Sequence, residues 1–154
     1  MEELIKNNNK DFSILNIQNF FIKNKINEVN VWNCKLGNNN KIEILINGMI
    51  IIKNYIMELN LYDNNLSKIP LSISKFQFIE ILNLRNNNFK IIPNEIYKLK
   101  LLKQLNLYNN KISLISLNIS KLFNLEILYL SNNKFKIFPI NIITLKNYLL
   151  ILII

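Results

Sequence analysis

The chain has 154 residues and a single cysteine, Cys34, so it has room for one domain and cannot form an internal disulfide. Half of the residues are hydrophobic, which excludes a disordered chain, and the formal net charge is +9. The absence of histidine removes imidazole bases, histidine zinc ligands and histidine-activated nucleophiles, and two glycines cannot build a phosphate-binding loop. We therefore expect no enzyme, no cofactor, no metal site and no small-molecule substrate.

The positive charge would ordinarily indicate an anionic partner. The chain is also rich in Asn, Ile, Leu and Lys and has no alanine, a bias expected when AT-rich codons are translated. Coding bias therefore accounts for the lysines without selection for binding. We expect no nucleic-acid partner, and a basic repeat protein associated with an anionic surface or nucleic acid remains the alternative.

No apolar run approaches the ~20 residues that a transmembrane helix requires. The first residues, MEELIKNNNKDF, include acidic side chains and no apolar run, unlike a signal peptide. We therefore expect an intracellular protein, in the cytoplasm or the nucleus. The triplets Asn65-Leu66-Ser67 and Asn118-Ile119-Ser120 match the glycosylation sequon of secreted chains, but such triplets arise by chance in an asparagine-rich sequence.

The start of the chain keeps no repeat. The stretch FSILNIQNFFI has apolar residues at mixed helical spacing, and we expect residues 1–25 to form an N-terminal cap over the first strand of a repeat array. Residues 26–55 contain a weak, irregular first repeat, whose apolar places are filled by Ile26, Val29, Val31 and Leu36.

This first repeat is seven residues longer than the regular step, and the extra length includes part of residues 41–53, KIEILINGMIIIK. Their two apolar runs flank Asn47-Gly48, a strong signal for a two-residue turn between antiparallel strands. We expect a hairpin or a distorted outer segment here.

From residue 56 a unit of constant length recurs without a slip, over 56–78, 79–101, 102–124 and 125–147. The consensus is L-x-x-L-x-L-x-x-N-x-L-x-x-I-P-x-x-I-x-x-L-x-x. In each LxL unit the two leucines share one face of an extended strand, and parallel stacking of such strands at about 4.8 Å builds a continuous core. The prolines fix φ and remove an amide, which favours short extended or 3-10 segments on the outer side.

An asparagine follows each LxL unit at the point where the chain must turn. Buried backbone amides and carbonyls at such a turn need partners, which a stacked ladder of side-chain amides supplies. We assign this structural role to Asn64, Asn87, Asn110 and Asn133.

The 23-residue pattern resembles the leucine-rich repeat, whose units span about 20 to 29 residues. The IP step makes it most similar to the intracellular, Ras-group type. The resemblance implies an α/β-type solenoid, with a short curved parallel sheet and extended or 3-10 outer segments. It also implies a scaffold or regulator of signalling proteins such as small GTPases, kinases and phosphatases. Cys34 stands at the first position of the asparagine ladder, where this family also places cysteine.

The residues between and just after the leucines should point away from the core and form columns across the strands. One column contains Trp, Tyr and Arg, the residue types most often found at binding hot spots. We predict a non-catalytic protein-binding site consisting of Trp32, Tyr62, Arg85, Tyr108, Tyr129, Glu58 and Asp63. The alternative is that the aromatic residues reflect strand propensity and that Arg85 merely stacks between two tyrosines.

Residues 148–154 begin a further, truncated repeat. In the 23-residue register, Ile151 and Ile153 take the inward places, which leaves Leu150, Leu152 and Ile154 facing solvent. A bare apolar edge strand invites pairing with another chain. Three interpretations fit this end: a truncated repeat fragment with no independent function, pairing with a partner chain, and self-association through residues 148–154.

Overall fold

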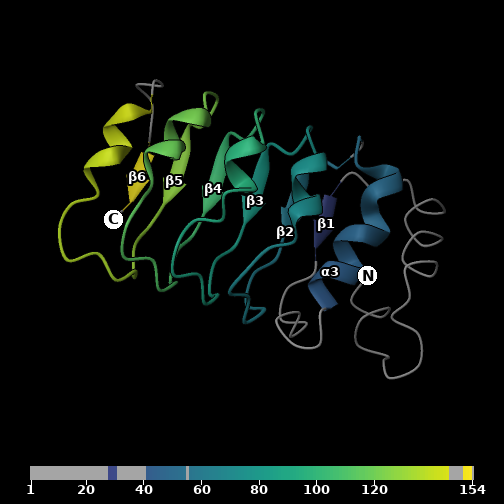
Figure 1. Ribbon diagram of the computed structural model, residues 1–154, viewed down its shortest axis with the longest axis horizontal. Coiled ribbons are helices and arrows are strands. Elements are labelled where there is room, and N and C mark those ends of the chain that lie inside the picture. Colours follow the sequence, from purple (N-terminus) through teal and green to yellow (C-terminus); the bar gives the residue numbers. More distant parts are fainter. Residues whose placement is uncertain (1–27, 31–40, 55, 146–150, 154) are drawn as a thin grey trace.

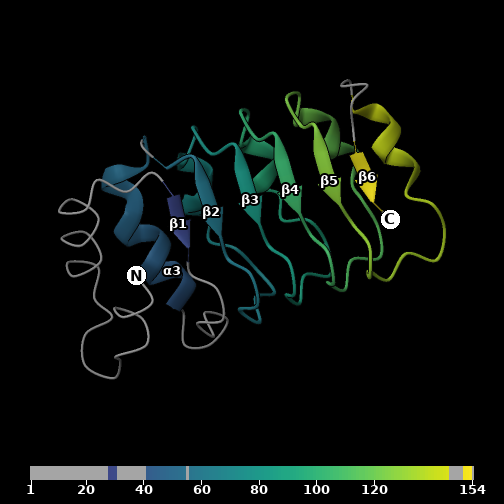
Figure 2. The same ribbon diagram turned by 180° about the vertical axis from the view of Figure 1, so that it is seen from behind.

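The computed structural model describes residues 28–30, 41–54, 56–145 and 151–153 (Figure 1). Six short parallel strands lie side by side in chain order in one curved sheet, most clearly seen in Figure 2. The strands are β1 (Glu28–Asn30), β2 (Glu58–Asn60), β3 (Ile81–Asn83), β4 (Gln104–Asn106), β5 (Ile127–Tyr129) and β6 (Ile151–Ile153). This arrangement confirms the predicted solenoid.

The outer layer consists of short 3-10 segments, one behind each repeat: η2 (Leu71–Lys75), η3 (Ile96–Lys98), η4 (Leu117–Lys121) and η5 (Ile140–Thr144). Each one starts at the proline column, where the carbonyl oxygen of Pro70, Pro93 or Pro139 accepts a hydrogen bond from the amide three residues later. Ser116 takes the proline place before η4, and its hydroxyl also accepts the Asn118 amide at 3.2 Å. The Ser116 carbonyl oxygen accepts the Ile119 amide as the proline carbonyls do, so proline and serine start the same turn.

The core lies between the sheet and these outer segments. Strands β2 to β5 pair one repeat unit apart each time, which aligns the central leucine of each strand. Val29 aligns with Leu59, so the longer first repeat also joins the sheet at the predicted position. Both leucine columns are completely buried: Leu59, Leu82, Leu105 and Leu128, and Leu61, Leu84, Leu107 and Leu130. Burial of each such side chain contributes about 1.5–3 kcal/mol.

Residues 41–53 were expected to form a hairpin or a distorted outer segment, and the hairpin prediction was wrong. These residues form the helix α3 (Lys41–Gly48), followed by the 3-10 segment η1 (Met49–Ile52). The helix buries Ile42, Leu45 and Ile46, and Met49 is buried just beyond it, which is the spacing of one helical face. The helical period of the apolar residues therefore outweighs the Asn-Gly turn signal, and α3 contacts η2 at the start of the regular stack.

The predicted register of the last strand was also wrong. Leu152 pairs with Leu128, so β6 lies one residue out of step with the 23-residue repeat, and Ile151 and Ile153 pair with the flanking residues of β5. Both alternating sets of the stretch YLLILII are apolar, so its pattern does not fix a register. Residues 1–25, which we predicted to form a cap, lie outside the described residues, and self-association through residues 148–154 stays a prediction.

The turn just before η5 is less covered than the equivalent turns inside the stack. The side chain of Phe138 is 54% exposed, whereas the equivalent side chains Ile69, Ile92 and Ile115 are 6%, 3% and 4% exposed. Inside the stack, each segment has a neighbour on both sides, and η5 packs against η4 on one side.

Candidate functional site

The face of the sheet that points away from the core is built by strand alternation. In each of β2 to β5 the central leucine is buried and the residues on both sides of it are partly exposed. Three of these strands end in asparagine, namely Asn60, Asn83 and Asn106. Each asparagine Oδ1 accepts a hydrogen bond from the backbone amide two residues later, at 3.0 to 3.1 Å. The chain beyond each strand is therefore held in the same turn.

The residues whose amides are held in this way are Tyr62, Arg85 and Tyr108, one from each of three neighbouring repeats. The guanidinium carbon of Arg85 lies 5.7 Å from the centre of the Tyr62 ring and 4.5 Å from that of Tyr108. Arg85 is exposed, and both tyrosines are partly exposed. Such cation–π contacts contribute about 0.5–1 kcal/mol each at exposed sites. We call these three residues the Tyr-Arg-Tyr column.

A second row of side chains fixes the tyrosine hydroxyl groups. Asn86 Nδ2 donates to the Tyr62 hydroxyl at 3.2 Å, and Asn132 Nδ2 donates to the Tyr108 hydroxyl at 2.7 Å. Between them, Asn109 Nδ2 donates to Asn86 Oδ1 at 3.0 Å. These three asparagines have φ between 53° and 57°, a left-handed conformation that asparagine tolerates better than most residues. Their identity therefore serves both the backbone turn and the hydroxyl contacts.

Behind this row runs the buried asparagine ladder. Asn87 Nδ2 donates to the carbonyl oxygens of Leu61 and Leu84, at 2.9 and 3.0 Å. Its Oδ1 accepts the amides of Asn64 and Leu66, at 3.2 and 2.8 Å. One side chain therefore satisfies buried backbone groups of two repeats and joins them.

The ladder continues through the next two repeats. Asn110 Nδ2 donates to the carbonyl oxygens of Leu84 and Leu107, and Asn133 Nδ2 donates to those of Leu107 and Leu130. The Asn110 side chain is buried, and the Asn133 side chain, in the last regular repeat, is partly exposed. The ladder holds the turns on which the sheet face depends.

A shallow, open groove of about 350 Å³ runs across the loops that follow the strands. Its lining is almost entirely amide side chains with two lysines: Asp63, Asn65, Asn86, Asn87, Asn88, Asn109, Asn110, Lys111, Asn132 and Lys134. Side-chain amides offer both hydrogen-bond donors and acceptors. The row formed by Asn86, Asn109 and Asn132 therefore lines the groove, and Asn86 and Asn132 also bond to the tyrosines of the Tyr-Arg-Tyr column.

Three segments of the chain, residues 55–76, 78–99 and 124–145, match the family model described as Leucine Rich Repeat. They coincide with three of the four regular repeats of the sheet. This chain is a leucine-rich repeat protein. No curated protein matches the chain in sequence.

Solved leucine-rich repeat structures resemble the chain in fold. A leucine-rich repeat protein of Leptospira interrogans is 28% identical, with a TM-score of 0.67 over 88% of this chain and 38% of that one. The plant peptide hormone receptor RGFR1, in complex with RGF2, is 33% identical, with a TM-score of 0.54 over 68% of this chain and 18% of that one. The leucine-rich repeat ectodomain of the receptor kinase SOBIR1 from Arabidopsis thaliana is 30% identical, with a TM-score of 0.54 over 69% of this chain and 60% of that one. The chain thus spans less than two thirds of the length of each of these proteins.

The remaining predicted site residues lie at different places on this leucine-rich repeat domain. Glu58 and Tyr129 are partly exposed residues of β2 and β5, at opposite ends of the four regular strands. Asp63 has φ of 55°, and its amide donates to the Arg85 carbonyl oxygen at 3.0 Å, so its backbone also shapes the turn. Trp32 and Cys34 lie outside the described residues.

The row formed by Asn86, Asn109 and Asn132 was missed as part of the site. The sequence carried a signal, because every regular repeat has Asn or Asp at this position. Such a column of Asn and Asp is typical of a repeated left-handed turn. The bonds to the tyrosine hydroxyl groups depend on side-chain directions that the repeat pattern does not contain.

Among the residues that the structure describes, no three His, Cys, Asp or Glu side chains come together as a metal-binding group would require. In the same ranges, no helix combines the length and the apolar character needed to cross a membrane. The leucine-rich repeat fold generally serves to bind other proteins, through the extended surface that its repeats create.

Proposed function

We propose that the chain is a non-catalytic binding module that recognises a partner protein through the exposed face of its sheet, with Arg85 at the centre of the contact. One observation carries this proposal: the Arg85 guanidinium is exposed and lies between two tyrosine rings. Tyr and Arg dominate binding hot spots because they combine large contact area with polar groups. A side chain that is already held in place also loses less conformational entropy on binding.

The guanidinium of Arg85 supports a specific partner chemistry. Its central carbon lies over both tyrosine rings, and among the described residues no hydrogen bond occupies the guanidinium N–H donors. A planar guanidinium fork binds a carboxylate through two parallel hydrogen bonds. We propose that a carboxylate of the partner, from Asp, Glu or a chain terminus, binds at Arg85.

The size of the sheet supports a short partner segment rather than a whole domain. Six parallel strands at about 4.8 Å give a face about 24 Å wide. The similar plant receptor is described as a peptide hormone receptor in complex with RGF2. We propose that the chain binds an exposed segment of its partner, with Tyr129, Glu58, Asp63 and Trp32 as further contacts around the Tyr-Arg-Tyr column.

We also propose that the protein acts inside the cell as a scaffold or regulator of signalling proteins. The 23-residue unit with its IP step supports the intracellular, Ras-group type, for which small GTPases, kinases and phosphatases are the implied partner classes. Asn65 is exposed and lies in a sequon, so a secreted chain would present an acceptor for glycan. We expect the endogenous protein to be unglycosylated and to fractionate with the cytoplasm. A glycan on Asn65 would contradict this placement.

The binding proposal is tested in two stages. First, the immobilised domain and its Arg85→Ala variant are used to capture proteins from a lysate of the cells that make this protein. Each captured protein is then expressed, and its affinity for the purified variants is measured by calorimetry. Arg85→Ala should weaken binding at least tenfold, and Arg85→Lys should do nearly the same because lysine lacks the planar fork.

The matched control is Lys90→Ala, which removes an exposed positive charge in a loop away from the sheet. It should change the affinity less than twofold. If Arg85→Ala and Tyr108→Ala both keep full affinity for every captured partner while the domain stays folded, the sheet face is not the binding site.

A further inference from the structure

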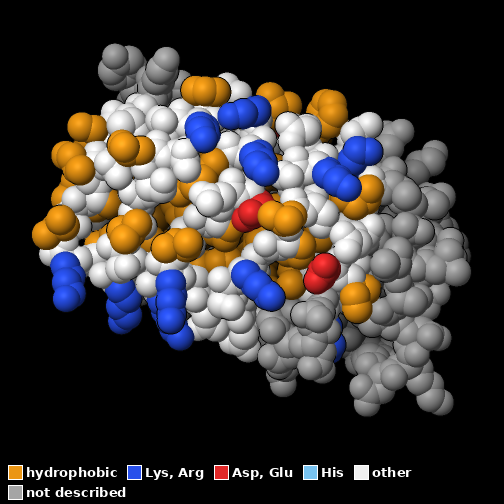
Figure 3. All heavy atoms as spheres, in the orientation of Figure 1, with side chains coloured by type: hydrophobic (Ala, Val, Ile, Leu, Met, Phe, Trp, Pro, Cys, Tyr) orange, Lys and Arg blue, Asp and Glu red, His pale blue; other side chains and the backbone are white. Residues whose placement is uncertain are grey.

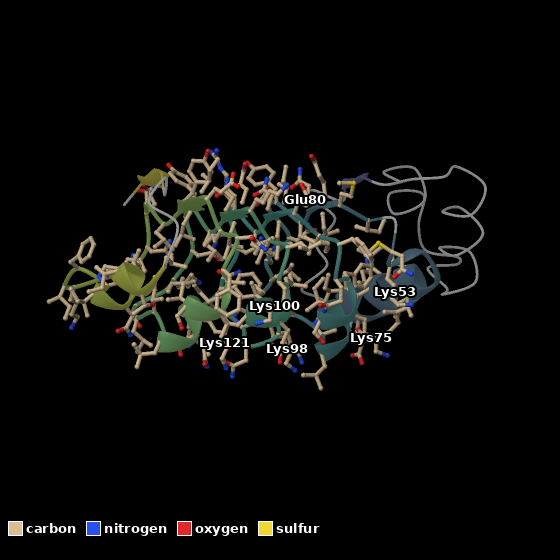
Figure 4. All side chains as sticks on the ribbon, turned by 90° about the horizontal axis from the view of Figure 1, so that it is seen from above. Lys53, Lys75, Glu80, Lys98, Lys100 and Lys121 are labelled. Atoms are coloured by element: carbon tan, nitrogen blue, oxygen red, sulfur yellow. The ribbon has the colours of Figure 1, made fainter. Side chains whose placement is uncertain are left out.

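A row of lysines lies at the ends of the outer segments. Lys75, Lys98 and Lys121 are the last residues of η2, η3 and η4, each separated from the next by one repeat, and Lys100 follows two residues after Lys98. Figure 4 shows these lysines, with Lys53, on the outer side of the domain, whereas Glu80 lies towards the sheet. We call Lys75, Lys98, Lys100 and Lys121, together with the apolar residues beside them, the basic rim.

The apolar members of the basic rim come directly after the same segments. Phe78 is 47% exposed, Leu101 39% and Phe123 50%. Figure 3 shows lysine and hydrophobic side chains next to one another along the upper edge of the outer face. Large apolar side chains between lysines are typical of surfaces that lie in the interfacial layer of a membrane.

Contacts within the basic rim link its charged and apolar members. Lys100 Nζ donates to the Lys121 carbonyl oxygen at 3.3 Å and lies 5.0 Å from the centre of the Phe123 ring. Lys75, Lys98, Lys100 and Lys121 are all exposed. The positive charge and the aromatic surface therefore face solvent together.

Few acidic groups oppose this charge. Within the outer segments 71–78, 94–101 and 117–124, Glu95 is the only acidic residue beside the four lysines. Glu80 lies just before β3 and forms a salt bridge with Lys103 at 2.8 Å, a contact that also raises the pKa of the lysine. Glu80 is therefore neutralised by a lysine outside the rim.

We propose that the basic rim docks the domain on an anionic lipid bilayer, with the lysines among the headgroups and Phe78, Leu101 and Phe123 in the interfacial layer. Charge complementarity favours an anionic surface, and the exposed apolar side chains favour a bilayer over a nucleic acid. Docking at the rim leaves the Tyr-Arg-Tyr column, on the other face, free for a partner.

The test is co-sedimentation of the full chain with vesicles of equal parts phosphatidylcholine and phosphatidylserine, and with vesicles of phosphatidylcholine alone. We expect binding to the anionic vesicles alone, weakened by added salt. Changing Lys75, Lys98, Lys100 and Lys121 to glutamine should weaken it by about fivefold for each lysine. Phe78→Ser with Phe123→Ser should weaken binding at least fivefold at unchanged net charge.

The matched control changes four lysines on loops away from the rim to glutamine, which lowers the net charge equally: Lys68, Lys90, Lys111 and Lys134. This control should change vesicle binding less than twofold. Equal losses in the two fourfold variants would overturn the proposal, because binding would then follow net charge alone. A single-stranded RNA oligomer is tested in parallel, and rim-dependent binding to the RNA without binding to vesicles would also overturn it. All variants replace exposed side chains, and circular dichroism checks that each one is folded.

Discussion

The sheet face and the basic rim present different kinds of surface on one stack of repeats. On the sheet face, Arg85 lies between two tyrosine rings, and asparagine side chains hold both tyrosine hydroxyl groups. On the rim, four lysines with flexible stems stand among exposed apolar side chains. A surface with a fixed shape selects a partner by fit, whereas a row of flexible charges suits an extended anionic surface. We therefore propose specific recognition for the sheet face and docking for the rim.

The largest expected effect tests the support of the sheet face. Asn87→Ala removes hydrogen bonds to buried backbone groups of two repeats, and each unsatisfied buried group costs about 1–3 kcal/mol. We expect the free energy of unfolding to fall by about 3 kcal/mol in urea denaturation. The neighbouring Asn88→Ala keeps its backbone bond to the Leu66 carbonyl oxygen and should cost less than about 0.5 kcal/mol. Equal losses in the two variants would show that the ladder does not support this face.

The second effect is a pH-dependent loss of stability in the core beneath the rim. Burial raises the pKa of Tyr97, in η3, to about 12 from its ordinary value of 10.0. The neutral phenol is favoured in the folded protein, so its contribution is fully present below pH 10 and is lost as the pH rises to about 12. Between about pH 9 and about pH 11.5, urea unfolding should show a loss about 2 kcal/mol larger for the wild type than for Tyr97→Phe. An identical loss in both would mean that the hydroxyl is not buried.

The repeat pattern predicts most of the residue positions that form these two surfaces. A constant 23-residue step fixes which leucines are buried and which residues stand in neighbouring positions, so the order Tyr62, Arg85, Tyr108 follows from the sequence. Stacking of Arg85 between the tyrosines was anticipated as the alternative to a binding site, but the geometry is compatible with both, because Arg85 is exposed. The lysine row also repeats in the sequence, but its lysines were attributed to coding bias.

Three features did not follow from the pattern, each for a physical reason. In residues 41–49 the helical spacing of apolar side chains competed with an Asn-Gly turn signal, and burial of the helical face decided the outcome. In β6 every residue is apolar, so alternation carries no information about register. The hydrogen bonds from Asn86 and Asn132 to tyrosine hydroxyl groups depend on the directions of the asparagine side chains. A column of asparagines suggests the left-handed backbone angles but does not fix these directions.

A smaller effect tests whether Arg85 serves mainly binding or the stability of the fold. Arg85→Ala removes two exposed cation–π contacts, so the free energy of unfolding should fall by about 1–2 kcal/mol. Urea denaturation of this variant beside the wild type measures the difference. A loss of about 3 kcal/mol, typical of a core substitution, would mean that Arg85 is a structural residue, and the binding data for its variants would then need another explanation.

The smallest effect concerns Phe138, which lies in the turn just before η5. Phe138→Ser should change the free energy of unfolding by no more than about 0.5 kcal/mol, because the side chain is largely exposed. The equivalent change inside the stack, Ile115→Ser, buries a hydroxyl group and should cost about 3 kcal/mol. Thermal or urea unfolding of the two variants decides the point, and a large cost for Phe138→Ser would show that this side chain is covered in the native protein.

The most direct test of the division between the two faces is the affinity of one identified partner for two variants, measured in solution without lipid. The account predicts that Arg85→Ala loses at least tenfold in affinity, while the variant with all four rim lysines changed to glutamine stays within about twofold of the wild type. The opposite result, with affinity lost in the rim variant and retained in Arg85→Ala, would contradict the assignment of partner recognition to the sheet face.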